Sequence, residues 1–542
     1  MAKIFNITGL CIPEKHYMVN IEGRLAEIKK FVDEGMYFTI NKARQYGKTT
    51  TLRALQDHLQ TEYYVISMDF QTFGSAEFEH ENCFALSFAD DFLHLLDENN
   101  LSVNMAKSLT DIFSHIKTCI ESESTTYRLR KLFKDLNEIC QKADKPIVLM
   151  IDEIDSAANH QVFLDFLAQL RAAYLGRNRQ AALHSVILAG VCDVKNLKRK
   201  LRPEDAHKIN SPWNIAADFN VDMALSKDGI SGMLSDYEND WHTGMNIGEI
   251  AGLIYDYTSG YPFLVSRLCK LMDEEVSKIQ HENKKSLNCA KKLAWTRAGF
   301  HEAVRMILEE KNALFESLIG KLTDFPVLNG MLQSLLFTGK PIIYNPDDLA
   351  IDAAGMFGFI KNQKGTAVIA NRIFETRLYN FYLSTAENQK RDIYKISLQD
   401  RNQFIVNGYL DMRRVLEKFV EHFHELYGDR DEDFIEEEGR RYFLLYLRPI
   451  INGTGSYYIE SRTRELRRTD VIVDYHGEQY IIEMKIWHGQ EYNHRGEEQL
   501  VRYLDNYHKT KGYMLSFNFN QKKKIGVKEV IIGDKILIEA TV

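Results

Sequence analysis

Two carboxylates and a lysine lie close together in the sequence between residues 469 and 485. Alternating apolar residues flank His476-Gly477 on both sides, which predicts an antiparallel hairpin with that pair as its turn. In this register Asp470 lies directly opposite Glu483, with Cβ atoms roughly 5 Å apart. Lys485 is two residues further along the strand and therefore shares their face. Adjacent carboxylates repel each other, so we expect a cation between them.

This group of side chains has the chemistry to cut a phosphodiester bond. Asp470 and Glu483 offer oxygen ligands, which suit Mg²⁺ or Mn²⁺. The metal would generate a hydroxide nucleophile and stabilise the developing charge, while Lys485 orients or activates the attacking water. Glu438, on the preceding helix, is a further candidate metal ligand and catalytic acid; the alternative is an ordinary acidic linker. Gln499, on the following helix, completes the candidate catalytic set.

A second motif lies near the start of the chain, where the strand Tyr37–Ile40 leads through a loop into a helix. Gly47-Lys48-Thr49 supplies the second half of the phosphate-loop motif GxxxxGK[ST], and Lys42 stands where the first glycine should be. Backbone N–H groups at such a helix start bind phosphate oxygens, Lys48 neutralises their charge and the Thr49 hydroxyl can hold Mg²⁺. The predicted ATP-binding residues are Arg44, Gln45, Tyr46, Gly47, Lys48, Thr49 and Thr50.

An acidic pair follows a fully apolar strand about a hundred residues downstream. Pro146–Ile151 ends in Asp152 and Glu153. We expect Asp152 to hold the metal of the bound nucleotide and Glu153 to act as the general base for hydrolysis. Candidates for a charge-stabilising arginine, each equally compatible with a solvated helix face, are Arg171, Arg177 and Arg179.

The two motifs resemble two known families. Residues 5–385 resemble bacterial AAA-like P-loop ATPases related to the archaeal-type (STAND) clade of signal-transduction ATPases, whose members also commonly lack the first glycine. That resemblance rests on Ala43–Thr49, Asp152-Glu153-Ile-Asp155, Ala189-Gly190, Ser211–Ile215 and Thr258–Phe263. The Asp–x12–Glu–x–Lys spacing resembles the PD-(D/E)XK nuclease superfamily, with Thr469 in place of the nominal proline. Relatives with this architecture imply a role in bacterial defence or mobile-element biology.

The order of the strands and helices that must position these residues indicates an α/β multidomain protein. Apolar strands alternate with helices over the first 200 residues, which indicates a P-loop parallel sheet covered on both faces; the strands are Tyr37–Ile40, Tyr63–Phe70, Ile147–Ile151 and Ser185–Val191. The predicted parts are a P-loop ATPase core at 1–224 with a helical insertion at about 78–143, a helical lid at 225–310, a winged-helix-like module at 311–390, a helical and acidic linker at 391–435, and an α/β PD-(D/E)XK nuclease-like domain at 436–542. In the last part we expect helices at Arg440–Ile451 and Glu497–Tyr507 and closing strands at Tyr513–Phe517 and Val530–Ile538.

Composition narrows the class of protein. The 542 residues carry a formal charge of −8, with 45% hydrophobic and 27% charged residues, as in an ordinary globular protein. No apolar run approaches the ~20 residues of a membrane span, and the first residues do not read as a signal peptide. Seven scattered cysteines without a CxxC pair indicate reduced thiols in the cytoplasm. Because the chain is acidic overall, nucleic-acid contacts must come from local basic patches. The candidates are the arginines between 462 and 468 and Lys522–Lys524, with a charged strand edge as the alternative for the latter, whereas the basic run Lys195–Arg202 is typical of solvated surface.

These observations favour an ATP-regulated, metal-dependent endonuclease acting on nucleic acid, with DNA favoured over RNA and ATP and Mg²⁺ (or Mn²⁺) as cofactors. The main alternative is a nucleotide-controlled switch or scaffold whose nuclease-like domain only binds nucleic acid or a partner. A third reading, an ATP-driven translocase, needs ring assembly and an arginine supplied between subunits. The sequence leaves homo-oligomer formation open.

Overall fold

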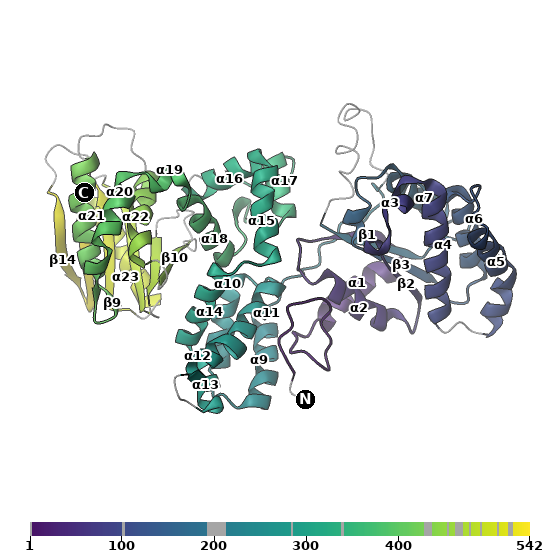
Figure 1. The fold of residues 1–542 in the computed structure, drawn as a ribbon, viewed down its shortest axis with the longest axis horizontal. Helices are drawn as coiled ribbons and strands as arrows, with labels where there is room; N and C mark the ends of the chain where they lie inside the picture. Colours follow the sequence, from purple (N-terminus) through teal and green to yellow (C-terminus); the bar gives the residue numbers. More distant parts are fainter. Residues whose placement is uncertain are drawn as a thin grey trace.

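The computed structural model describes residues 3–99, 103–191, 213–282, 286–337, 341–427, 436–451, 455–460, 470–475, 478–487, 490–506, 509–518 and 524–542. Figure 1 shows an elongated molecule with an α/β core that contains one sheet at one end and a second sheet at the other. Two groups of helices, one above the other in this view, lie between the two sheets.

The first sheet is parallel and has the strand order β1-β4-β3-β2. Val148 and Met150 point to the face covered by helices α1 and α2, whereas Leu149 and Ile151 point to the face covered by α4, α6 and α7. Burial on both faces explains why these strands are continuously apolar. All four predicted strands are confirmed, as β1 (Tyr37–Asn41), β2 (Tyr64–Asp69), β3 (Ile147–Asp152) and β4 (Ser185–Gly190).

Helices surround this sheet where the apolar periodicity predicts them. The inner helices are α1 (Glu22–Asp33), α2 (Lys48–Leu59) and α7 (Gln161–Gly176). Between β2 and β3 the chain forms α3 (Ser75–Glu79), α4 (Glu81–Glu98), α5 (Val103–Glu121) and α6 (Leu129–Lys142). The rings of Phe84 and Phe88 lie 5.3 and 5.1 Å from that of Phe166 on α7, which attaches the insertion to the core.

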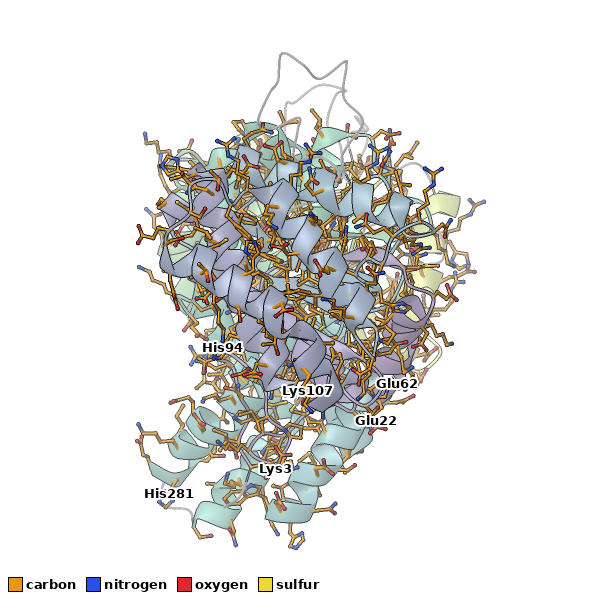
Figure 2. The ribbon with its side chains drawn as sticks, turned by 90° about the vertical axis from the view of Figure 1, so that its right-hand side faces the viewer. Lys3, Glu22, Glu62, His94, Lys107 and His281 are labelled. Atoms are coloured by element: carbon orange, nitrogen blue, oxygen red, sulfur yellow. The ribbon has the colours of Figure 1, made fainter. Side chains whose placement is uncertain are left out.

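A helical group follows the sheet and carries the N-terminal segment. Its helices are α9 (Lys227–Trp241), α10 (Ile247–Thr258), α11 (Pro262–Lys270), α12 (Ser277–Glu282), α13 (Leu287–Ala294) and α14 (Arg297–Glu309). The rings of Phe5 and Tyr17 lie 5.3 and 5.2 Å from that of Tyr237 on α9. Figure 2 accordingly places Lys3 beside these helices and His281 near their tip.

The next group combines helices with a small three-stranded sheet of order β5-β7-β6. Its elements are α15 (Ala313–Asp324), α16 (Pro326–Phe337), β5 (Ile342–Ile343), α17 (Leu349–Met356), β6 (Ile360–Gln363), β7 (Thr366–Ile369) and α18 (Arg372–Leu383). Helix α18 contacts both the lid helices α10 and α14 and the first strand of the C-terminal sheet.

The C-terminal sheet is mixed and has the order β10-β11-β12-β13-β15-β14. Its strands are β10 (Gly455–Glu460), β11 (Asp470–Tyr475), β12 (Glu478–Ile486), β13 (Lys511–Phe517), β14 (Gly526–Ile532) and β15 (Lys535–Thr541). Helix α23 (Gln490–Asn506) covers one face, and α22 (Glu436–Ile451) packs on the other. The single closing strand predicted at Val530–Ile538 was wrong, because Gly533 adopts φ +62° and turns the chain between β14 and β15.

Helices form in the segment predicted as a helical and acidic linker at 391–435. Helices α20 (Asp392–Asp400) and α21 (Met412–Tyr427) belong to the C-terminal fold, and α21 packs on β14 and β15. Phe419 and Phe423 on α21 lie one turn apart, with rings 6.4 and 5.4 Å from that of Phe517 on β13. The apolar stripe of α21 is therefore buried, as an amphipathic helix requires. The acidic residues 428–435 lie outside the described residues.

Candidate functional site

The loop between β1 and α2 has the conformation of a phosphate-binding turn. Gln45 and Gly47 adopt left-handed conformations, with φ of 56° and 80°, whereas Lys42 does not. Lys42 can therefore occupy the position of the first glycine of the motif without backbone strain. Lys48 begins α2, is 6% exposed, and donates from Nζ to the carbonyl oxygens of Lys42 and Ala43 at 3.1 and 3.3 Å.

The two groups predicted to hold a metal beside the nucleotide meet in the structure. The Thr49 hydroxyl donates to Asp152 Oδ2 at 2.6 Å, and the backbone N–H of Glu153 donates to Asp152 Oδ1 at 2.9 Å. The fixed carboxylate and hydroxyl offer hard oxygen ligands at the carboxyl end of β3. This donor set fits Mg²⁺.

Glu153 follows Asp152 with a left-handed backbone and a raised pKa. It adopts a left-handed conformation with φ 52° directly after β3, so its side chain leaves the line of the strand. Burial raises the pKa of the Glu153 carboxyl, while the Lys48 ammonium opposes that rise. A carboxylate with a raised pKa accepts a proton more readily, which suits a general base.

A cavity of about 490 Å³ opens beside the loop, a volume suited to a nucleotide. Six of the seven predicted ATP-binding residues line it, together with Glu153. Arg44 lines instead a separate cavity beside Asp155 and α15. Other parts of the wall lie far from the loop in sequence. Pro262 and Phe263 belong to the Thr258–Phe263 motif, whereas the motif analysis missed Asn6–Gly9, Cys11, Tyr17–Val19, Arg24 and Met233.

The arginine candidates are not brought to this cavity. Arg177 Nη1 donates to the Gly35 carbonyl at 2.8 Å and its guanidinium lies over the Tyr174 ring, so it supports the core. Neither Arg171 nor Arg179 is among the residues that line the cavity. The basic stretch Lys195–Arg202 lies outside the described residues.

The sequence matches a family model, described as AAA-like domain, over residues 15–288, just over half of the chain. The chain belongs to the AAA-like domain family. Its N-terminal half is thus an AAA-like, ATP-binding P-loop domain. No curated protein matches the chain.

Similar solved structures are archaeal. A Walker-type ATPase of Pyrococcus abyssi is 14% identical with a TM-score of 0.45, covering 69% of this chain and 99% of its own. Cdc6p of Pyrobaculum aerophilum is 12% identical (TM-score 0.33), covering 69% of this chain and 96% of its own. Orc1 of Aeropyrum pernix, solved in complex with DNA, is 11% identical (TM-score 0.28), covering 67% and 93%.

The hairpin of the C-terminal sheet has the register that the sequence predicts. Asp470 on β11 pairs directly with Glu483 on β12, and the turn residues lie outside the described residues. The side chains of Asp470 and Glu438 are likewise not described, so their predicted metal contacts stay predictions. The basic residues between 462 and 468 and Lys522–Lys523 also lie outside the described residues, so the phosphate contacts expected of them stay predictions.

Three predicted catalytic residues come together on the face of the sheet under α23. Glu483 is fully buried and Lys485 is 6% exposed. Lys485 Nζ lies 3.5 Å from Glu483 Oε1, and Gln499 Nε2 donates to Glu483 Oε2 at 3.4 Å. Within the described residues Glu483 Oε1 accepts no hydrogen bond. The Lys485 ammonium partly compensates the buried charge of Glu483, and a carboxylate oxygen that accepts no hydrogen bond can also take a bound cation.

Gly496 allows α23 to approach this group. A Cβ atom at position 496 would lie 2.6 Å from Lys485 Nζ and 2.8 Å from its Cε. Any larger residue would displace the lysine from its place beside Glu483. The sequence pattern of the helix gives no sign of this contact.

Two further carboxylates that sequence reasoning missed lie near the same face. Glu483 pairs with Met514 and Met514 with Glu539, so the two glutamates share one face of the sheet. Lys528 Nζ lies 2.7 Å from Glu539 Oε2. Burial raises the pKa of Glu539, and its contact with Glu497 acts in the same direction. Among the described residues no three His, Cys, Asp or Glu side chains form a metal-binding group.

A membrane span was not expected, and none of the helices that the structure describes is both long and apolar enough to cross a bilayer.

Proposed function

We propose that this chain is an ATP-regulated, metal-dependent nuclease that cleaves phosphodiester bonds of nucleic acid, with DNA as its substrate. The observation that carries the proposal is the hairpin register, which pairs Asp470 with the fully buried Glu483. Lys485 and Gln499 lie against Glu483 at the same place. Hydrophobic packing would not select two facing carboxylates, because like charges opposite each other destabilise a sheet.

ATP hydrolysis is assigned to the AAA-like domain. Lys48 would bind the terminal phosphates, and Thr49 and Asp152 would hold Mg²⁺. Glu153 accepts a proton from the attacking water, a role that its raised pKa supports. The lid and the N-terminal segment close the cavity against bulk water.

Phosphodiester cleavage is assigned to the C-terminal sheet. Asp470, Glu483 and Glu438 would hold Mg²⁺ or Mn²⁺, which when bound activates water and stabilises charge on the phosphate. Lys485 orients the water and the scissile phosphate through its ammonium group. Gln499 would fix the Glu483 carboxylate by donating to Oε2, and Oε1, beside the Lys485 ammonium, would be the oxygen that binds the cation.

The proposal is tested with purified full-length protein, supercoiled plasmid, single-stranded DNA and RNA, each with and without ATP. We expect cleavage in Mg²⁺ or Mn²⁺ and none in Ca²⁺ or excess EDTA. ATP should alter the cleavage rate of the wild type but not that of Lys48→Ala. If the protein binds DNA and hydrolyses ATP but never cuts the DNA, the result would favour a nucleotide-controlled switch or scaffold instead.

A further inference from the structure

A large cavity lies where the lid, the winged-helix-like group and the C-terminal sheet meet. Its volume is about 590 Å³, within the range that holds a small organic ligand. The walls come from α14, α15, α18, α22 and β10. Figure 1 shows α18 between the lid helices and the C-terminal sheet, which is the position of this junction. The cavity is separate from both candidate catalytic groups.

Arginine side chains link the three parts across this cavity. Arg377 on α18 donates to the carbonyl oxygen of Leu308 on α14. Arg448 on α22 donates from Nη1 to the Asn380 carbonyl on α18 at 2.6 Å. Each guanidinium has five N–H donors, so one bond to a backbone carbonyl leaves most of its donors available to a ligand.

The charge of the lining is positive although the whole chain is acidic. Arg305 is already paired with Glu302 and Glu309. The other charged groups that line the cavity are Lys311, Arg377 and Arg448 against Glu316 alone. Burial lowers the pKa of Arg377, and the Glu310 carboxylate opposes that effect. A partly desolvated cation of this kind is stabilised by an anion.

Aromatic and hydroxyl groups complete the wall. The Arg377 guanidinium lies 4.9 Å from the centre of the Phe315 ring, and Phe381 is 36% exposed beside it. Tyr457 on β10 is 2% exposed, and its hydroxyl has no hydrogen-bond partner among the described residues. Arg448 is close enough to act on the pKa of that hydroxyl. An unpartnered buried hydroxyl beside an arginine lacks the acceptor that a ligand oxygen would provide.

We propose that this junction cavity binds a small organic phosphate, with the phosphate held by Arg377 and Arg448 and an aromatic body lying against Phe315 and Phe381. Paired guanidinium forks match the geometry of phosphate oxygens. Because the ligand would contact all three parts at once, it would stabilise their arrangement. The proposal does not depend on nuclease activity.

The test is isothermal titration of the full chain with its phosphate loop filled by ADP and Mg²⁺. The probes are AMP and 1-naphthyl phosphate, with 1-naphthoate as the carboxylate counterpart and 1-naphthol as the neutral one. We expect one equivalent of either phosphate to bind and to raise the melting midpoint, 1-naphthoate to bind more weakly, and 1-naphthol not to bind.

Three substitutions test the side chains that are proposed to bind the phosphate. Arg377→Gln and Arg448→Gln should each weaken phosphate binding by about tenfold or more, as expected for a lost charged hydrogen bond. Tyr457→Phe removes only the hydroxyl and should weaken it several-fold without affecting folding. Arg413→Gln is the matched control, since Arg413 lies on the exposed side of α21, paired with Glu417. Three outcomes would overturn the proposal. The first is that Tyr457→Phe and either folded arginine variant bind the phosphate as tightly as the wild type. The others are that neither phosphate binds, or that single-stranded DNA displaces the probe.

Discussion

The two sheets of this protein hold their acidic residues in different ways. In the parallel sheet, Asp152 ends strand β3 and Glu153 lies just beyond it, at an edge bordered by loops and the cavity. In the mixed sheet, Glu483 lies inside β12, fully buried beneath a helix. A carboxylate at the end of a strand, such as Glu153, can be reached by a ligand in the cavity. A carboxylate on a covered face needs partners in place, because desolvating a charge costs several kcal/mol.

The acidic residues of the two sheets are therefore held by different kinds of neighbours. Asp152 is held by the Thr49 hydroxyl at the start of α2 and by the backbone N–H of Glu153. Glu483 is held by Lys485 on its own strand and by Gln499 on the covering helix α23. We therefore expect the covered-face group to be the more sensitive to substitutions of its neighbours.

The largest effect is expected from Glu483 itself. Glu483→Ala should reduce DNA cleavage by about a thousandfold or more, because it removes a metal ligand that also pairs with Lys485. ATP turnover should stay close to wild type, since the two groups lie on separate sheets. Gel assays of plasmid cleavage and a phosphate-release assay measure the two activities.

Glu478→Gln is the matched control, because Glu478 is on the same strand but exposed. If Glu483→Ala folds and still cuts at the wild-type rate, Glu483 is structural and the covered-face group is not catalytic.

The next largest effect concerns the edge group. Lys48→Ala should abolish ATP binding in calorimetry, because it removes the charge that neutralises the phosphates. Glu153→Gln should retain binding and slow hydrolysis by roughly 10²–10⁴-fold, since an amide cannot accept the proton.

Lys42→Gly is the informative control for this pair. It restores the glycine of the usual motif, and it should change ATP affinity little, because the Lys42 backbone is not left-handed and its carbonyl acceptor is retained. A large gain in affinity would show that the lysine side chain obstructs the nucleotide.

An intermediate effect should follow from Gly496→Ala. The added methyl group would meet Lys485 and shift it, and misplacements of about 1 Å can cost roughly a hundredfold in rate. Cleavage should fall by about tenfold to a hundredfold with ATP turnover unchanged. Gly320→Ala on α15, where nothing lies within 4 Å of the new Cβ, should leave both activities intact. Equal cleavage by the two variants would argue against close packing of α23 on Lys485.

The smallest effect is a pH dependence at the contact between the lid and the C-terminal sheet. His301 Nδ1 on α14 lies 3.1 Å from Asp474 Oδ2 on β11, and both residues are buried. Burial, Arg297 and Lys509 lower the pKa of His301 to about 4. The ring is therefore uncharged at neutral pH.

Because the unfolded chain binds the proton more readily, the stabilising contribution of neutral His301 is complete above pH 6.5. It is lost as the pH falls towards 4, at up to about 1.4 kcal/mol per pH unit. His301→Gln should flatten this part of the unfolding free energy measured against pH. An unchanged slope in the variant would mean that other groups control the acid stability.

Local patterns predicted much of the two candidate groups. The strand–loop–helix around Lys48 and the pairing of Asp470 with Glu483 both follow from contacts between nearby residues, where periodicity and turn chemistry specify the geometry. The same reasoning failed at Val530–Ile538, because apolar residues on both sides of Gly533 obscured a turn. At residues 391–427 it predicted a helical segment, but not that α21 packs on β14 and β15.

The sequence by itself determined which residues have phosphate and metal chemistry, and on which strands and loops they lie. Only the tertiary structure decided that the N-terminal segment and the lid line the nucleotide cavity, that α23 brings Gln499 to Glu483, and that three parts enclose a basic cavity at Arg377 and Arg448. The reason is physical. Hairpin register and helix starts depend on residues a few positions apart, whereas these contacts depend on how whole elements pack, and many different sequences satisfy the same packing.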